Sequence, residues 1–490
     1  MRLRKTASGF PLAAAAALGL AAPAGAAVKV TSPTLVPGYS AKATDFTVKC
    51  SSPVSFAVTA GTGEKVSVDG KPARSGSFTE TVALSPGQAT RLRVERAGIT
   101  RNQTVRCLPD DFPLWKTEIS GTPRAQWYLL TTSMKAVVGG GLPFYGLPYV
   151  AVADSRGVPV WWYKDPAGLP MNAQFMGSKS IFWNVITEDA GSIRDLDGRV
   201  TRTIQASNAL TDQHDIQRTS DGGFLVIGAV TRQCPEVPSD CVDLTQWKGP
   251  KDATILDNEV QKFDRDGRLE WKWSTRDHIS PEEVARWVAS PFARPTVNLG
   301  GRIVYDLFHV NSVSEDGDGV VISVRHADAL YRMTDEGRRI DWKLGGTKTA
   351  RSLRVKGITA GTKLFGGQHN ARVLRDGTVT VFDNGTHWTR TPRALRFRLS
   401  GRTATLLEKV TDKRARLAIG TGSATRLKGG NWAVTWGVGS PFISEVTPSG
   451  RPVLTLTIPD GMFSYRIDAL EPGLVSAADL RAGMDAQFPR

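Results

Sequence analysis

Short runs of alternating apolar and polar residues recur along most of the chain, separated by turns that contain glycine. The two-residue period of these runs is that of β-strands with one buried face. The regular succession of such runs and turns predicts a repeated hairpin in which each turn leads into a strand. Six copies carry an acidic residue or a serine just before the glycine: DSRGVPVWWY from Asp154, DLDGRVTRTI from Asp195, DRDGRLEWKW from Asp264, DEGRRIDWKL from Asp335, SGRTATLLEKV from Ser400 and PSGRPVLTLTI from Pro448.

The six copies lie roughly 40 to 70 residues apart, which is the spacing of propeller blades that carry insertions. No segment alternates strands with long helical patterns, so a parallel α/β fold is disfavoured. We therefore expect an all-β chain built around a six-bladed β-propeller of four-stranded blades with a central channel. A solenoid or a sandwich remains open, but neither brings equivalent side chains to one centre as readily.

The first segment of the chain has the pattern of a targeting signal. Residues 1–26 combine a basic start with the apolar run PLAAAAALGLAA and a small-residue ending, as in a secretory signal peptide cleaved near Ala26. The run is too short to span a bilayer comfortably, and no later stretch approaches the necessary length. We expect a secreted or periplasmic protein without a membrane span.

Two domains are expected after the signal peptide. Residues 27–110 contain short strand patterns between turns, among them FTVKC, KVSVDG and TRLRVER, and predict an accessory β-sandwich of immunoglobulin-like appearance. Residues 111–490 form the predicted propeller. In an exported protein, Cys50 and Cys107 are expected to join an early and a late strand of the sandwich by a disulfide.

The other two cysteines lie in RQCPEVPSDCVDL, a proline-containing insertion in the predicted propeller. Cys234 and Cys241 are seven positions apart, and a local disulfide is the simplest pairing. A zinc site is the alternative, but the spacing does not fit a Cys-x-x-Cys knuckle and no histidine lies in the loop.

The chain is basic, with 62 Lys and Arg against 47 Asp and Glu and a formal charge of +15. Removal of the predicted signal peptide takes away three positive charges and leaves +12. The basic residues are scattered and no nucleic-acid-binding motif is present, so we expect no nucleic-acid partner. The charge favours colloidal solubility, and a positive field can also draw anionic substrates toward a channel.

Three of the six histidines occupy the same place in another repeated unit: QHDIQRTSDGGFLVIG from Gln213, FHVNSVSEDGDGVVISVR from Phe308 and QHNARVLRDGTVTVFDNG from Gln368. Each copy has a histidine, an acidic-glycine turn and then a β-branched strand. If the unit is a structural repeat, His214, His309 and His369 converge on one axis. The corresponding position in TGSATRLKGGNWAVTWG falls near Gly422, so the histidine is not required in every blade, unlike the buried histidine of WD-type propellers.

An arginine belongs to the same predicted cluster. Sixteen residues and one tight turn separate His309 from Arg325, so the two are expected on adjacent antiparallel strands near one rim. The guanidinium suits a tetrahedral or planar oxyanion, and an imidazole can act as nucleophile or as general acid and base. His326 is expected to face away from Arg325, as neighbours on a strand do, and to be structural. His278 and His387 are predicted at the surface or rim.

Three histidines can also bind zinc or iron, with Asp215 and Asp306 as carboxylate partners behind them. Arg325 argues against this alternative because a guanidinium is poorly placed beside a divalent cation, and we expect neither a metal nor another cofactor. A quinoprotein-like dehydrogenase would need cofactor-stacking tryptophans. The available tryptophans fall at the repeated turn-strand position and are interpreted as packing residues: Trp161, Trp162, Trp271, Trp273 and Trp342. A non-catalytic binding propeller stays open as well.

At these residues the chain resembles a known family. The segments DLFHVNSV, VVISVRHADALYRMTDEGRRIDWKLGG and FGGQHNARVLRDGTVTVFDNG are similar to signature stretches of the bacterial arylsulfotransferase (arylsulfate sulfotransferase) family, whose members are six-bladed propellers exported to the cell envelope. The order of His-x-Asn-Ser, Ser-x-Arg and Gln-His-x-Ala-Arg is specific, and the N-terminal sandwich also resembles the family's accessory β-domain.

The resemblance implies a role for each matching residue. His369 corresponds to the histidine that attacks the sulfur of the donor and carries the sulfuryl group as a sulfohistidine. Arg325 corresponds to the arginine that binds the sulfuryl oxygens. The implied substrates are an aryl sulfate donor and a phenolic acceptor, with ping-pong kinetics and no nucleotide sulfate donor. Further implied site residues are His309 and His214, which hydrogen-bond the sulfate and assist proton transfer, and Asn311 and Asn370, which bind substrate.

Overall fold

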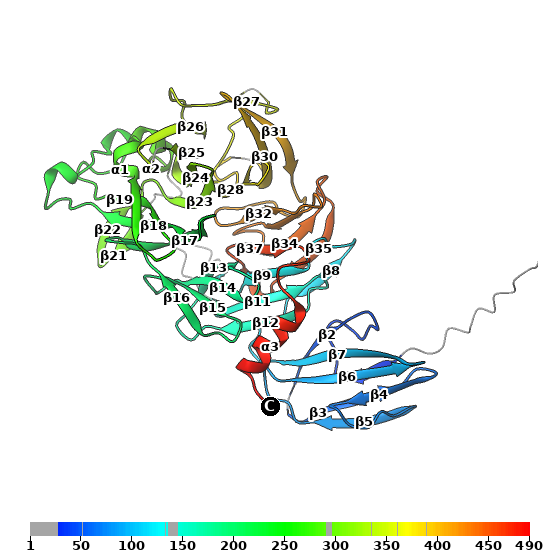
Figure 1. Ribbon diagram of the computed structural model, residues 1–490. Coiled ribbons are helices and arrows are strands. Elements are labelled where there is room, and N and C mark those ends of the chain that lie inside the picture. Colours follow the sequence, from blue (N-terminus) through cyan, green and yellow to red (C-terminus); the bar gives the residue numbers. More distant parts are fainter. Residues whose placement is uncertain are drawn as a thin grey trace, which may run out of the picture.

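The structure is a computed structural model that describes residues 28–490 except 51, 133, 136–145, 291–295, 335, 360 and 389. Within these residues the chain is all-β, with strands in many sheets and only short helices (Figure 1). The predicted signal peptide, residues 1–26, lies outside the described residues and stays a prediction. No described helix is long and apolar enough to cross a membrane.

Two sheets at the N-terminal end of the chain share one apolar core. In β6, Leu92 and Val94 are buried and Arg93 between them is exposed, which is the alternation of a sheet with one buried face. Cys107 in β7 forms the predicted disulfide with Cys50. In hydrogen-bonded order the sheets are β1 (Lys29–Ser32), β3 (Val54–Thr59), β5 (Ser77–Val82) and β2 (Asp45–Lys49), β7 (Ile99–Leu108), β6 (Ala89–Arg96), β4 (Glu64–Val68).

Six larger sheets follow among the described residues, and all their neighbouring strands are antiparallel except β27 and β31. In hydrogen-bonded order they are β37 (Ile467–Leu470), β9 (Trp127–Thr131), β11 (Tyr149–Asp154), β12 (Pro159–Lys164); β13 (Pro170–Phe175), β14 (Ser180–Val185), β15 (Gly191–Asp195), β16 (Val200–Ile204); β17 (Leu210–Arg218), β18 (Phe224–Thr231), β19 (Leu256–Phe263), β20 (Leu269–Ser274); β23 (Val310–Asp316), β24 (Gly319–Val324), β25 (Ala329–Thr334), β26 (Arg339–Gly345); β28 (His369–Val373), β29 (Val379–Asp383), β30 (Arg393–Ser400), β31 (Thr403–Val410), β27 (Arg354–Lys356); and β32 (Ser423–Arg426), β33 (Trp432–Thr435), β34 (Phe442–Val446), β35 (Pro452–Thr457), β8 (Lys116–Ile119).

The first strands of these sheets contact one another in a closed order: β13, β17, β23, β28, β32, β37 and back to β13. This arrangement is propeller-like, with the other strands of each sheet further out (Figure 1). Two strands close it from opposite ends of the sequence. The late strand β37 is the first strand of the sheet that contains β9, and the early strand β8 is the last strand of the sheet that contains β35.

The sequence repeat maps onto the same place in every one of these sheets. Each turn-strand copy connects the third strand to the fourth, as Asp154–Gly157 does between β11 and β12. Gly157 and Gly198 have left-handed backbones, with φ 75° and 91°, and the pairing register shifts within two paired positions of five of the six turns. The histidine-containing unit spans the first and second strands of three consecutive sheets.

Tryptophans fill the space between neighbouring sheets. Trp161 of β12 is fully buried against Trp183 of β14, with ring centroids 6.5 Å apart. Trp162, Trp273 and Trp342 are buried as well, which is the packing position interpreted from the sequence.

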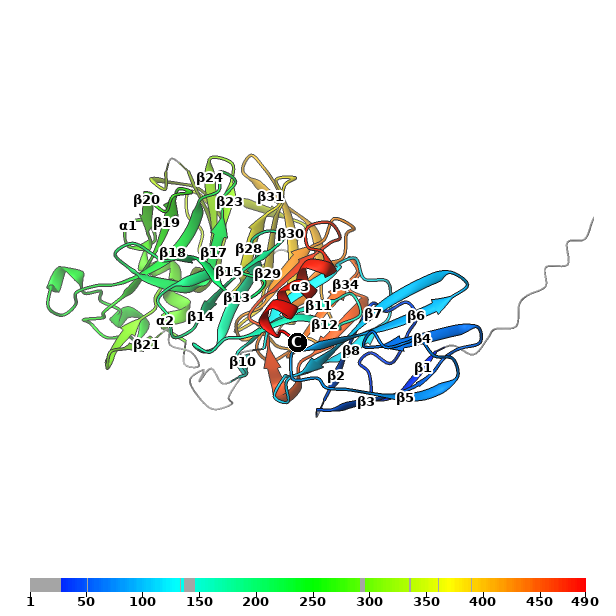
Figure 2. The ribbon, with the colours of Figure 1, turned by 60° about the horizontal axis from the view of Figure 1, so that its bottom comes forward.

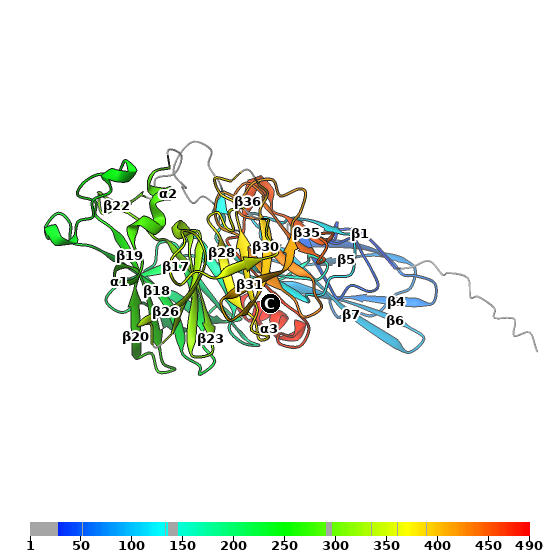
Figure 3. The same ribbon diagram turned by 90° about the horizontal axis from the view of Figure 1, so that it is seen from above.

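The connections between the sheets carry the remaining elements. Figures 2 and 3 show that α2, the β21–β22 hairpin and the β10–β36 pair lie on one side of the propeller-like body. These elements are α1 (Thr275–His278), η3 (Pro281–Val284), α2 (Ala285–Val288), β21 (Thr296–Leu299), β22 (Arg302–Tyr305), β10 (Met134–Lys135), η5 (Pro459–Gly461) and β36 (Met462–Phe463).

Helix α3 (Ala477–Gln487) lies between this body and the N-terminal sheets (Figures 1 and 2). It contacts β12 and buries Leu480 and Met484. Arg481 of the helix forms an ion pair with Asp45 of β2. The helix therefore ties the two parts of the molecule together.

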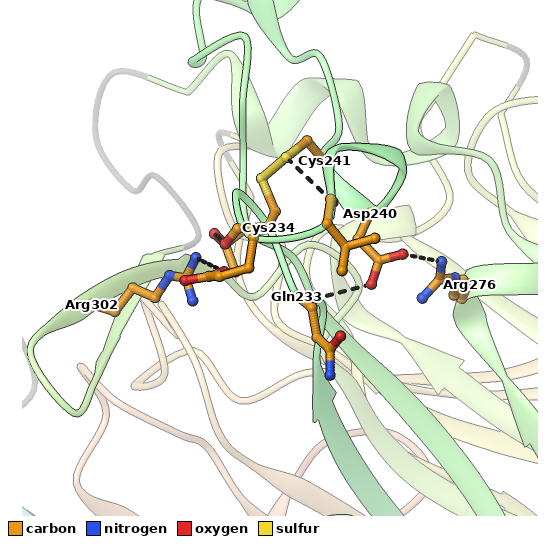
Figure 4. Close-up of a disulfide and its surroundings, with 9 residues drawn as sticks. Gln233, Cys234, Asp240, Cys241, Arg276 and Arg302 are labelled. Atoms are coloured by element: carbon orange, nitrogen blue, oxygen red, sulfur yellow. Dashed lines mark hydrogen bonds and ion pairs between the residues drawn. A yellow bond between two sulfur atoms is a disulfide. The ribbon is translucent and has the colours of Figure 1, made fainter.

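The second predicted disulfide, between Cys234 and Cys241, closes part of the loop between β18 and β19 (Figure 4). The loop also contains η1 (Pro238–Asp240) and η2 (Thr245–Trp247). Asp240 accepts a hydrogen bond from the backbone N–H of Gln233 and forms an ion pair with Arg276. The two thiols are paired with each other, so the zinc alternative for this loop is wrong.

Candidate active site

The three predicted histidines lie in the first strands of three consecutive sheets or directly before them. His214 lies within β17, His309 directly precedes β23, and His369 is the first residue of β28. The pairing register of each strand shifts close to its histidine, and His309 has a left-handed backbone with φ 58°. Such irregularities re-aim side chains and concentrate at functional sites.

His214, His309 and Arg325 form one cluster. The two imidazole rings meet edge to face with 4.5 Å between centroids, and 25% and 20% of their side-chain surfaces stay exposed. The backbone N–H of Arg325 donates to the carbonyl oxygen of His309 at 3.1 Å. The structure thus brings the two residues together as predicted, although they lie just beyond the paired ends of β23 and β24 rather than on the strands.

His369 adjoins this cluster through the loop before β32. Its Nε2 accepts a hydrogen bond from the backbone N–H of Thr421 at 3.2 Å. Nη2 of Arg325 donates to the carbonyl oxygen of Ile419, two residues earlier, at 2.9 Å. One short loop therefore contacts both the imidazole and the guanidinium. His369 itself is nearly buried, with 2% of its surface exposed.

Nδ1 of each imidazole has a side-chain partner, which leaves Nε2 as the nitrogen for chemistry. Nδ1 of His214 lies 2.6 Å from the carboxylate of Asp212, and Nδ1 of His309 is paired with the carboxylate of Asp306. The sequence predicts that Asp306 is a carboxylate partner of a histidine. Asp212 escaped sequence reasoning, although a carboxylate two residues before a histidine is a local signal that could have found it.

His369 has neutral partners instead. Its Nδ1–H donates to Oδ1 of Asn384 at 2.7 Å and to the carbonyl oxygen of Gly367 at 3.0 Å. The amide nitrogen of Asn384 donates to the carbonyl oxygen of Thr421 at 2.8 Å, which fixes the orientation of the amide. Because both partners of Nδ1 are acceptors, Nδ1 carries the hydrogen and Nε2 carries the lone pair.

These surroundings do not shift the pKa values of the three histidines alike. Burial, together with the positive charge of Arg325, holds the pKa of His369 well below its ordinary value, so this imidazole is neutral. Burial also opposes protonation of His214, but the carboxylates of Asp212 and Asp306 together outweigh it, so the pKa of His214 is raised.

The pKa of His309 moves the other way. Burial lowers it, the positive charge of His214 lowers it further, and the attraction of Asp306 does not compensate. Of the two rings in contact, His214 therefore holds a proton more strongly than His309. Titratable groups whose environments push their pKa values apart can divide acid and base roles.

Arg325 opens η4 (Arg325–Ala327), the turn that follows β24. Its Nη1 lies 2.8 Å from Nε2 of His326, and its Cζ lies 4.3 Å from the ring centroid of Trp287. Burial lowers the pKa of Arg325 to about 10, which leaves the guanidinium charged near neutral pH. Two hydrogen bonds and one aromatic face thus fix its position.

The expectation that His326 faces away from Arg325 is wrong. The two residues share one tight turn, so they do not alternate as neighbours on a strand do. The ring of His326 stacks on that of His309 with centroids 4.9 Å apart. His387 is exposed at the rim, as predicted, and His278 stacks on Trp273.

Asp215 is not a partner of His214. It is fully buried and forms ion pairs with Arg372 of β28 and with Arg466, which directly precedes β37. The two guanidinium groups hold the pKa of Asp215 below its usual value although burial opposes this. Arg466 also donates to the carbonyl oxygen of Asn311 at 2.6 Å. This network links several first strands at the centre of the body.

The two predicted substrate-binding asparagines are buried among the first strands. Nδ2 of Asn311 donates to the carbonyl oxygen of Gln368 at 2.8 Å, whereas its Oδ1 has no hydrogen-bond partner among the described residues. Oδ1 of Asn370 accepts from the backbone N–H of Ala424 at 3.2 Å. Both side chains join β23 or β28 to a neighbouring segment. Among the described residues no group of three or more His, Cys, Asp or Glu side chains is placed to hold a metal ion.

Comparison with known proteins identifies one family. The model of the family described as Arylsulfotransferase (ASST) matches residues 186–458, more than half of the chain. No curated protein matches the sequence. Among solved structures, a protein of unknown function from Bacteroides caccae is 11% identical, with 71% of this chain and 99% of that chain covered and a TM-score of 0.43. A streptogramin B lyase is 10% identical, with coverages of 76% and 91% and a TM-score of 0.33.

Proposed function

Because the chain belongs to the arylsulfotransferase family, we propose that it transfers a sulfuryl group from an aryl sulfate to a phenolic acceptor through a covalent sulfohistidine. The family match supports the reaction class. The roles of individual side chains rest on the geometry of the site. No nucleotide sulfate donor takes part in the proposed reaction.

Nε2 of His369 is the proposed nucleophile. It attacks the sulfur of the aryl sulfate, the N–S bond forms as the aryl S–O bond breaks, and the aryl oxygen leaves as a phenolate. Positive charge that develops on the ring is stabilised at Nδ1–H by the oxygens of Asn384 and Gly367. The long hydrogen bond from Thr421 uses the same lone pair, so it breaks as the sulfur arrives.

His214 and His309 are the proposed proton carriers. Protonated His214 gives its proton to the departing phenolate. In the second half-reaction, His309 takes the proton of the acceptor phenol while the acceptor oxygen attacks sulfur and the N–S bond breaks. His369 returns to its neutral form, and the proton passes between the two rings in contact, which restores the starting state.

Arg325 is the proposed binding group for the sulfuryl oxygens. Its Nη1 and Nη2 each make one hydrogen bond, to His326 and to Ile419. A guanidinium has five N–H groups, so within the described part of the chain three remain for the substrate. A fixed charge at this place stabilises the negative oxygens in the transition state.

The observation that carries the proposal is the difference between the hydrogen-bond partners of Nδ1 in the three histidines. An amide holds His369, while carboxylates hold His214 and His309. A nucleophilic imidazole must be neutral, and a proton carrier benefits from a partner that stabilises its charged form. The family resemblance assigns the same three residues these roles.

We further propose that the six larger sheets are the blades of a propeller over residues 111–490, with residues 27–110 as an immunoglobulin-like accessory domain. The closed order of the first strands supports the first proposal, and the separate core of the N-terminal sheets supports the second. Export by the predicted signal peptide is consistent with two disulfides, which persist in oxidising compartments.

Trapping the intermediate tests the proposed function. The protein is mixed with a chromogenic nitrophenyl sulfate in the absence of acceptor. The expected result is a burst of one equivalent of nitrophenol and the mass of one sulfuryl group on a peptide that contains His369. Addition of a phenol should release the label as an aryl sulfate.

The variant His369→Asn should show neither the burst nor the label, because the attacking nitrogen is absent. The control is His278→Asn, a histidine stacked on Trp273 outside the site, which should behave as the unmodified protein. A label on another residue, or turnover by His369→Asn, would falsify the assignment of the nucleophile.

A further inference from the structure

The indole of Trp287 is contacted by two arginine–histidine pairs. The Cζ of Arg325 and the ring centroid of His326 lie 4.3 and 4.6 Å from the indole centroid. The Cζ of Arg286 and the ring of His387 lie 4.7 and 4.9 Å from it. Trp287 is 1% exposed, so the indole is almost completely buried where these groups meet.

Trp287 reaches this place on the insertion between β20 and β21, which contains α1, η3 and α2. Asp328, which directly follows η4, anchors the insertion. Its carboxylate accepts from Nε1 of Trp287 at 3.3 Å and pairs with the guanidinium of Arg286. The turn that carries Arg325 therefore also holds the segment that covers it.

His326 supports Arg325 from the other direction. Its Nδ1 lies 2.9 Å from the carbonyl oxygen of Asp306, an acceptor, so Nδ1 carries the hydrogen and Nε2 is left as an acceptor for Nη1 of Arg325. Burial and the nearby charges hold the pKa of His326 well below its ordinary value, so Nε2 keeps its lone pair. The carboxylate of the same Asp306 holds His309.

We propose that His326 and Trp287 are positioning residues that fix the guanidinium of Arg325 in the orientation that receives the sulfuryl oxygens. The proposal rests on the proposed sulfuryl transfer. A free arginine side chain has many rotamers, and binding a tetrahedral anion in one orientation costs that freedom unless the scaffold has already removed it. A cation over an indole face and a hydrogen bond to a neutral imidazole remove it without neutralising the charge.

Substitutions at His326 separate positioning from simple packing. A glutamine can donate to Asp306 and accept from Arg325, whereas a leucine can do neither. We expect His326→Leu to lower kcat for sulfuryl transfer by about tenfold or more, since a hydrogen bond to a charged group is lost. His326→Gln should retain most of kcat. His278→Leu is the matched control, because His278 stacks on a tryptophan in the same way outside the site, and it should leave kcat unchanged.

A binding experiment separates this proposal from the proposed function. An arylsulfonate, whose C–S bond cannot be transferred, is titrated calorimetrically into the unmodified protein, His326→Leu, Arg325→Ala and the double variant. If His326 acts through Arg325, each single variant weakens binding by about tenfold or more and the double variant is no weaker than Arg325→Ala. Equal binding by His326→Leu and the unmodified protein, or an additive loss in the double variant, overturns the proposal.

The outcomes distinguish a failure of the positioning role from a failure of the proposed sulfuryl transfer. Non-additive binding losses in a protein that does not transfer sulfate support the positioning role and refute the transferase. Sulfuryl transfer that is unchanged in His326→Leu supports the transferase and refutes the positioning role. If His326→Leu does not fold, as judged by its thermal transition, the comparison of Trp287→Phe with Trp287→Leu replaces it. The aromatic variant should keep arylsulfonate affinity and the aliphatic variant should lose it, and equal affinities would refute the role of the indole face.

Discussion

Replacement of Asn384 by aspartate should change the pH at which His369 becomes a nucleophile. Oδ1 of Asn384 lies 2.7 Å from Nδ1 of His369, so an aspartate would place a negative charge against a ring that is now neutral. Opposite unit charges about 4 Å apart attract by about 4 kcal/mol at an effective dielectric constant of about 20. A factor of ten in a protonation equilibrium corresponds to about 1.4 kcal/mol.

The sign follows from the role of the ring. An added carboxylate raises the pKa of His369, so the ring takes up a proton at a higher pH and the nucleophile is lost earlier as the pH falls. Even if desolvation of the new carboxylate offsets half of the attraction, the acid limb of the pH–rate profile should move upward by more than one pH unit. At pH values above that limb His369 is unprotonated, so protonation of the ring should not lower the rate there.

The assay is the single-turnover rate of nitrophenol release across the pH range in which the variant is folded. The control is Asn384→Leu, which removes the amide and its contact to Thr421 without adding a charge. This variant should be slower by about tenfold, and its acid limb should not move upward, because the hydrogen bond to Asn384 that favours protonation is lost while Gly367 still accepts from Nδ1–H. An unmoved acid limb in Asn384→Asp, or an equal shift in both variants, would refute the reasoning.

Three further predictions concern the charge and the cross-links of the molecule. Arg325→Lys keeps the charge but loses the planar set of donors, and kcat should fall by about 100-fold, measured with a nitrophenyl sulfate and a phenol; a change of less than threefold would contradict the role of the guanidinium. Asp215→Asn leaves the buried Arg466 and the partly buried Arg372 without their carboxylate, and urea unfolding should show a loss of about 3–5 kcal/mol; an unchanged midpoint would count against it. Cys50→Ser should cost about 4 kcal/mol and Cys241→Ser about 2–3 kcal/mol in the same experiment, because the disulfides join cysteines 57 and 7 positions apart; the reverse order would contradict the loop-entropy argument.

The strands and turns of this chain could be predicted because their signals are local. An acidic residue, a glycine and a β-branched run occupy consecutive positions, and the structure places each such turn between a third and a fourth strand. The placement of His309 opposite Arg325 follows from the same kind of counting across one hairpin. The family could be identified because these local motifs occur in a specific order.

The remaining parts of the site depend on contacts that periodicity does not encode. Asn384 lies just after β29, and the pairing places Phe382, not Asn384, opposite His369, so counting residues along the hairpin does not bring the two together. His326 turns toward Arg325 because the strand ends in a 3-10 turn at that point. Arg466 pairs with a carboxylate that lies 251 positions earlier in the chain, and only the closure of the ring brings them into contact.

The closure of the ring of first strands sets the order in which its contacts can form. Asp215 and Arg372 emerge from synthesis or translocation well before Arg466, which directly precedes β37. Until β37 joins β9, the carboxylate lacks one of its two guanidinium partners and the ring of first strands stays open. A chain still in transit therefore cannot complete this buried network, and the ring of first strands closes only when β37, late in the sequence, pairs with the much earlier β9.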